Sequence, residues 1–164
     1  MSLNKLCFII CIALVSMSSC SKSPNRSYSF SNDSRGCGDF MVYKTLDDNT
    51  AITVIGSKEA LDLSTSVQVF QLSNTDIQIS IDEFDDTIGS YYCDDVVNDN
   101  ANLIQQHFAN SATVEIDVSN PNPVMFETYE ITIRLKNVEF EFDGETVRYD
   151  EIVFEDVTVG WLPG

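Results

Sequence analysis

The sequence is poor in the residues on which most catalytic sites depend. Its 164 residues include one histidine and one tryptophan. A serine triad needs a histidine, and His107 is accompanied by no Gly-x-Ser-x-Gly motif, so we expect it to be a partly buried structural residue. Walker loops and dinucleotide-binding glycine motifs are absent as well. Because no catalytic motif is present, we predict a protein that is not an enzyme.

Basic residues are also scarce. Nine lysine and arginine residues stand against 26 aspartate and glutamate residues, which gives a formal net charge of −17 at pH 7. Such a charge repels the phosphate backbone of nucleic acids, and the chain has no basic patch that could overcome this repulsion. Nucleic acid is therefore excluded as a partner.

No apolar run is long enough to cross a membrane as a helix. The longest, residues 6–15, is ten residues long and follows the single cation Lys5. This layout, with small residues after the apolar run, is typical of an export signal. The run ends near the motif Met17-Ser18-Ser19-Cys20, which resembles the lipobox of bacterial lipoproteins.

The resemblance covers only the first 20 residues, and it departs from the commonest form at Met17 and Ser19. It implies that residues 1–19 are removed as a signal peptide and that the thiol of Cys20 is diacylated. Several acyl chains together anchor a protein stably to a bilayer. Ser21, where an aspartate would favour retention in the inner membrane, implies the outer membrane. The predicted location is thus the bacterial cell envelope, with the membrane as a partner through the lipid.

Beyond Cys20 the sequence divides into a tether and one domain. Residues 20–36 hold the lipidated cysteine and are rich in serine, which is typical of a flexible tether. Residues 37–164 have the length of a single domain. In this domain only Cys37 and Cys93 remain, and an even pair in an exported domain predicts a disulfide. A metal or redox pair is the alternative, although no Cys-x-x-Cys motif is present.

The domain has the patterning of an all-β protein. Short segments rich in isoleucine and valine alternate apolar and polar residues and are bounded by turn residues. These segments are 40–44, 51–55, 67–72, 76–82 and 112–118. We predict an antiparallel β-sandwich, of which an immunoglobulin-like fold is one form, with a lipocalin-like barrel as the alternative. Residues 101–109 have helical spacing and are predicted to be a short helix or a loop.

The last forty residues predict one long hairpin. Asp143-Gly144 is a strong two-residue turn signal, so residues 128–142 should pair with residues 145–160. The apolar alternation changes parity along both arms, and a parity change requires a bulge. We expect bulges near Asn137 and near Asp150 or Asp156.

Two groups of residues are candidates for binding. Two acidic clusters flank Cys93, and closely spaced carboxylates are what calcium prefers; the alternative is acid-rich turns. The candidate ligands are Asp82, Asp85, Asp86, Asp94, Asp95 and Asp99. Tyr91, Tyr92 and Trp161 lie beside a loop or at the chain end, where exposed aromatic side chains would contact a glycan or a protein.

These features predict a lipid-anchored, non-catalytic module that binds an envelope protein or a glycan, or that supports an envelope complex. The alternative from another class is a calcium-dependent or carboxylate-based glycan hydrolase, and a structural spacer is the third possibility. The tripeptide Asp86-Thr87-Ile88 also resembles short sites at which some bacteria glycosylate exported proteins.

Overall fold

A computed structural model describes residues 28–57, 61–63, 67–93, 101–120 and 128–160. Within these ranges the chain forms eight β-strands and one 3-10 turn. The strands are β1 (Arg35–Cys37), β2 (Met41–Asp47), β3 (Thr50–Ile55), β4 (Val67–Gln71), β5 (Gln78–Phe84), β6 (Leu103–Val118), β7 (Tyr129–Phe142) and β8 (Glu145–Val159), and the turn η1 (Leu72–Asn74) follows β4. The prediction of an all-β fold is confirmed.

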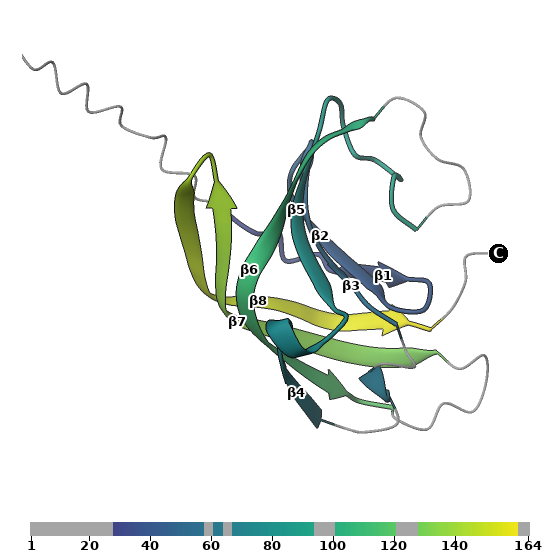
Figure 1. The fold of residues 1–164 in the computed structure, drawn as a ribbon. Helices are drawn as coiled ribbons and strands as arrows, with labels where there is room; N and C mark the ends of the chain where they lie inside the picture. Colours follow the sequence, from purple (N-terminus) through teal and green to yellow (C-terminus); the bar gives the residue numbers. More distant parts are fainter. Residues whose placement is uncertain (1–27, 58–60, 64–66, 94–100, 121–127, 161–164) are drawn as a thin grey trace, which may run out of the picture.

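All strands belong to one antiparallel sheet that curls into a half-barrel (Figure 1). The strand order is β1-β2-β3-β5-β6-β7-β8, and β4 pairs with β6 outside this path. The first half of β6 pairs with β5 and its second half pairs with β4. Thus β4 takes the place beside β6 where the pairing with β5 ends. Because the curl gives the sheet a concave face, one core fills it, as in a sandwich or a barrel.

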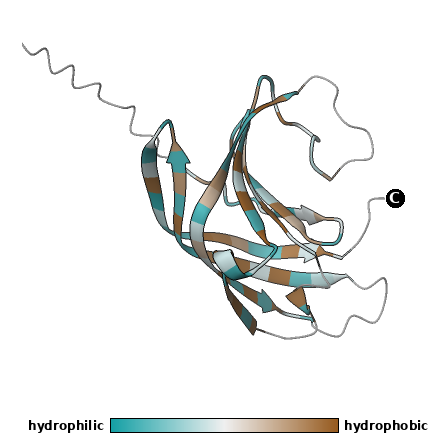
Figure 2. Ribbon diagram, in the orientation of Figure 1, coloured by the Kyte–Doolittle hydropathy of each residue, from teal (hydrophilic) through white to brown (hydrophobic). Residues whose placement is uncertain are grey.

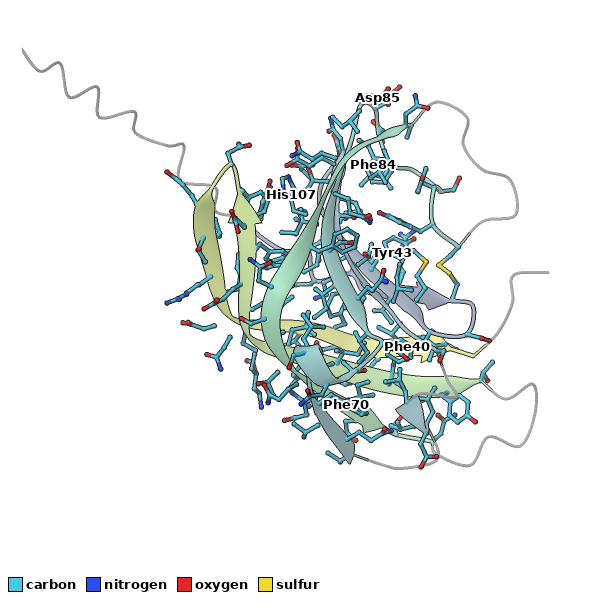
Figure 3. All side chains as sticks on the ribbon, in the orientation of Figure 1. Phe40, Tyr43, Phe70, Phe84, Asp85 and His107 are labelled. Atoms are coloured by element: carbon cyan, nitrogen blue, oxygen red, sulfur yellow. A yellow bond between two sulfur atoms is a disulfide. The ribbon has the colours of Figure 1, made fainter. Side chains whose placement is uncertain are left out.

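The core consists of the side chains that point into the curl. Apolar and polar residues alternate along the long strands, which Figure 2 shows as alternating brown and teal bands. Phe40, Phe140 and Phe154 are the largest side chains that are fully buried. Phe40 lies deep inside the concave face (Figure 3). Burial of these rings and of the surrounding isoleucines and valines supplies the main favourable term in folding.

The long hairpin has the predicted arms and turn. Phe142 pairs with Glu145, and the turn residues Asp143 and Gly144 both have positive φ angles, 50° and 84°. This backbone conformation matches the twist of the flanking strands, and glycine and aspartate tolerate it best. The hairpin prediction is therefore confirmed.

The predicted bulges have different consequences for the register. At Asp156, where φ is 50°, the β7–β8 register shifts by one residue. At Asn137, where φ is 52°, the residues that point into the core change from odd to even numbers, between the buried residues Leu135 and Val138. Asp150 lies opposite Asn137. Because the alternation of inward and outward side chains changes at the same place in both strands, the β7–β8 register continues unbroken. The register shift of β7 against its other neighbour, β6, falls in the same region.

The prediction for residues 101–109 is wrong. Residues from Leu103 onward form the start of β6 and pair with β5. The apolar residues that suggested a helix do not form a buried helical face, because Leu103, Ile104 and Phe108 are exposed. Backbone pairing with β5 overrides the local spacing here.

The predicted tether overlaps the folded domain. Tyr28 and Phe30 pack against the core, the ring of Phe30 lies 5.1 Å from that of Tyr149, and β1 begins at Arg35. The backbone N–H of Gly160 donates to the carbonyl of Gly38 at 2.7 Å, which joins the two ends of the sheet. Gly36 allows this approach, since a Cβ at that position would meet the Val157 side chain and lie 2.8 Å from the carbonyl oxygen of Thr158.

Cys37 and Cys93 form a disulfide, as predicted, between the end of β1 and the loop after β5 (Figure 3). Its sequence separation is 56 residues.

Replacing both cysteines by alanine should lower the free energy of unfolding by up to about 4 kcal/mol, because the open chain gains loop entropy when it unfolds. Urea denaturation of the mature protein measures this difference.

The mature protein should also gain two alkyl labels at these cysteines, and only after reduction. Labelling of the unreduced protein would contradict the disulfide.

Candidate functional site

A buried polar cluster lies on the outer face of β3, β5 and β6. Its centre is the carboxylate of Asp82, whose residue is 3% exposed. Tyr92 donates its hydroxyl to Asp82 Oδ2 at 2.7 Å, and Ser80 and Gln106 donate to Oδ1 at 2.8 and 2.9 Å. The hydroxyl of Thr53 lies 2.8 Å from that of Ser80. A buried carboxylate requires such donors, since its oxygens have lost their contact with water.

The cluster attaches the loop of residues 85–93 to the sheet. Tyr92 belongs to this loop, and its neighbour Cys93 carries the disulfide, so the loop is held by a covalent bond and by a hydrogen bond to a charged group. Burial, with the nearby charge of Asp82 as the next cause, raises the pKa of Tyr92 far above its ordinary range. The phenol therefore remains a donor at every physiological pH.

This arrangement gives Asp82 a structural role that the sequence did not predict. A calcium ligand needs carboxylate oxygens that are open to the ion, whereas both oxygens of Asp82 already accept hydrogen bonds from the protein. Asp85 accepts from the backbone and side-chain nitrogens of Asn102 at 2.7 and 3.0 Å, and the backbone hydrogen bond is the main cause that lowers the pKa of Asp85. Asp86 accepts from the backbone N–H of Thr87, whose side chain is exposed.

The predicted calcium ligands do not converge in the part of the chain that the structure describes. There, no three histidine, cysteine, aspartate or glutamate side chains are placed to hold a metal ion. Asp94, Asp95 and Asp99 lie outside the described residues.

The structure places two of the predicted aromatic contact residues, Tyr91 and Tyr92, in the attached loop. Tyr92 is 7% exposed, and Tyr91 is half-buried with its ring 4.6 Å from that of Phe84. Together with Tyr43 these rings form a second, smaller core between the sheet and the loop. These rings stabilise the loop, and Tyr43 and Tyr92 also line an open depression beside it. Trp161 lies outside the described residues.

His107 is buried on the opposite, concave face of the sheet. Its partner across the strands is Ile81, while the neighbouring pair Asp82 and Gln106 points outward. Its Nε2 lies 3.7 Å from Glu83 Oε1, and its ring lies 4.3 Å from that of Phe142. The expected structural role agrees with this position, because the imidazole is buried against the ring of Phe142.

An open depression lies beside the attached loop. One part, of about 630 Å³, is bounded by β1, by the loop and by β8. A second part, of about 570 Å³, lies between the N-terminal segment, β2 and the same loop. Arg35, Tyr43 and Gly89 line both parts, so the two parts adjoin each other.

The lining of this depression mixes polar, charged and apolar side chains, and Phe30, Leu46 and Ile88 belong to its second part. Hydroxyl groups come from Ser34, Ser90 and Thr158, and the carboxylates include Asp33 and Asp156. Arg35 is the single cation among the residues that line it. It donates to Asp33 Oδ2 at 3.1 Å, and this hydrogen bond, with a further one to Tyr43, raises the pKa of Arg35.

Sequence reasoning missed Arg35 and Tyr43 as candidate residues. Arg35 was part of the predicted tether, and Tyr43 was one aromatic residue among many in a strand. The one available signal was the position of Arg35 two residues before Cys37, since a disulfide there brings the flanking residues to the loop around Cys93.

Comparison with protein-family models, with curated proteins and with solved structures finds no match for the chain. Among the described residues, no helix has the length and apolarity needed to cross a membrane.

Tyr92→Phe should lower the free energy of unfolding by about 2 kcal/mol, because it leaves one oxygen of a buried carboxylate without its donor. Tyr91→Phe is the matched control: it keeps the ring that packs on Phe84 and should change stability much less. Equal losses in the two variants, measured by urea denaturation, would contradict the role given to the Asp82 hydrogen bond.

Proposed function

We propose that this chain is a lipid-anchored module of the bacterial cell envelope that binds a glycan without cleaving it. The observation that carries the binding role is the depression around Arg35 and Tyr43. Hydroxyl and charged groups lie there beside the aromatic rings of Phe30, Tyr43 and Tyr92. Sugars present many hydroxyl groups that both donate and accept, and such a lining can satisfy them.

The charges around the depression favour a neutral glycan. Asp33, Asp47, Asp48 and Asp156 line its two parts, and Arg35 is already paired with Asp33. An anionic sugar would meet uncompensated carboxylates and would be repelled. A neutral sugar avoids this cost and still has Arg35 as a charged donor.

The positions of Asp82 and His107 exclude these two groups from hydrolysis in the depression; the carboxylates that do line it are tested by the hydrolase alternative below. General acid–base work needs groups within hydrogen-bond reach of a substrate. Asp82 is buried with its oxygens satisfied, and His107 lies on the concave face of the sheet. Neither group lines the depression.

Arg35→Ala should weaken binding of a neutral oligosaccharide by about tenfold, the effect of one lost hydrogen bond from a charged donor. The matched control is Arg148→Ala, which removes an exposed arginine paired with Glu139 on the long hairpin. An array of neutral and acidic oligosaccharides identifies the ligand, and titration calorimetry gives the affinities. Equal binding by both variants would place the site elsewhere, and shortening of the glycan during incubation would favour the hydrolase alternative.

The anchoring part of the proposal rests on the lipobox and on a short connection. Tyr28, which packs on the domain, follows Cys20 by eight residues, and eight residues span at most roughly 28 Å. A lipid on Cys20 would therefore hold the folded domain close to the bilayer.

Cys20→Ala should release the protein from the membrane fraction, because the acyl chains would be absent. Fractionation and immunoblotting measure this release, and protease treatment of intact cells tells the outer surface from the periplasm. If Cys20→Ala remains in the membrane fraction, the lipoprotein assignment is wrong, whatever the result of the glycan titrations.

A further inference from the structure

Three apolar side chains at the start of β6 are in contact with solvent. Leu103, Ile104 and Phe108 are 42%, 62% and 51% exposed. The stretch from Leu103 to Phe108 reads Leu-Ile-Gln-Gln-His-Phe and contains no acidic residue, in a chain that has 26. Such a local concentration of exposed apolar side chains is typical of a contact surface, because its removal from water is favourable.

The glutamine between Ile104 and Phe108 on this face turns its amide nitrogen into the protein. Gln106 donates to Asp82 Oδ1 at 2.9 Å and to Ser80 Oγ at 3.2 Å. These acceptors belong to the buried polar cluster, so the nitrogen does not depend on water for its hydrogen bonds. This lowers the cost of placing the stretch against an apolar phase.

The exposed stretch lies at the end of the sheet where the described chain starts. Tyr28, the first described residue, donates its hydroxyl to Glu83 Oε1 at 3.2 Å. Glu83 pairs across the strands with Gln105, which belongs to the exposed stretch. In Figure 3, Asp85 marks this end of the sheet, and Phe70 of β4 marks the opposite end.

The proposed lipid anchor places the bilayer near this same end. Tyr28 follows Cys20 by eight residues, which span at most roughly 28 Å. The ten residues of β6 from Gln105 to Glu115, which pairs with Val69 of β4, span about 33 Å. Because the fully extended connection is shorter than this stretch of strand, the anchor favours a bilayer beside the start of β6 over one beside β4.

We propose that the start of β6 contacts the lipid bilayer that holds the anchor, with Leu103, Ile104 and Phe108 placed between the headgroups and the acyl chains. This inference rests on the lipid anchor of the proposed function, but not on glycan binding, because the three side chains line neither part of the depression. Three partly exposed side chains alone bind a bilayer weakly. The anchor keeps them at a high effective concentration beside it, so the contact forms within the anchored molecule.

The charges at this end of the sheet determine which headgroups fit. Asp85 accepts from the backbone and side-chain nitrogens of Asn102, directly before β6, and Asp86 follows it in the loop. These carboxylates would repel anionic headgroups. We therefore expect the contact with headgroups that carry no net charge, such as phosphatidylcholine.

Quenching by brominated lipid tests the contact in the processed, lipidated full chain. Cys37 and Cys93 form the disulfide and Cys20 would carry the lipid, so a fluorescent maleimide labels only a cysteine introduced by mutation. In vesicles of phosphatidylcholine with brominated acyl chains, the label on Ile104→Cys should lose most of its fluorescence, because bromine quenches at contact distance. Val69→Cys is the matched control, since Val69 is 60% exposed but lies at the β4 end, and its label should keep its fluorescence.

Flotation of the vesicles reports the anchor separately from the contact. If both labelled chains float and the label at position 104 is not quenched, or is quenched no more than the label at position 69, the bilayer contact is wrong and the anchor stands. If neither chain floats, the anchor fails and the contact fails with it. A blue shift of the label at position 104 without quenching by bromine also overturns the proposal, since the label would then be buried against protein. Phe108→Cys supplies a second position on the same face, where the same quenching is expected, and unchanged melting temperatures show that the variants fold.

Discussion

The curl of a single sheet around one core is the constraint on which the rest of the structure depends. Three long strands, β6, β7 and β8, cannot stay flat and still bury their apolar residues on one side, so they bend. The bends occur where the parity of the side chains changes, at Asn137 and Asp156. They bring the end of β8 to the start of the sheet, where Gly160 bonds to Gly38.

The same curl creates the surface to which we assign the proposed function. Where β1 meets β8, the backbone leaves an open depression, and the loop with Tyr92 forms its other wall. The lining combines carboxylates and hydroxyl groups with aromatic rings, and this combination suits a hydrated glycan.

Asp82 shows how a strongly acidic chain can bury one of its carboxylates in a structural role. Most carboxylates remain hydrated at the surface, where their mutual repulsion is screened. Asp82 instead becomes the acceptor that holds the loop, because Tyr92, Ser80 and Gln106 supply three donors. The disulfide alone would fix one point of this loop. With the hydrogen bond to the buried carboxylate, the loop that forms one wall of the depression is held at two neighbouring residues, Tyr92 and Cys93.

The sequence by itself indicated strands β2 to β5, the second half of β6, the hairpin with its turn at Asp143-Gly144, the need for bulges and the disulfide, because alternation, turn chemistry and cysteine count are local or nearly local signals. It did not indicate β1 or the first half of β6. Its lipobox remains a prediction about residues outside those described. Only the tertiary structure decided that Asp82 is buried, that Tyr92 is its donor and that Leu103 begins a strand. These outcomes depend on which segments pair and which loop covers the sheet, and no local pattern of apolar and charged residues contains that information.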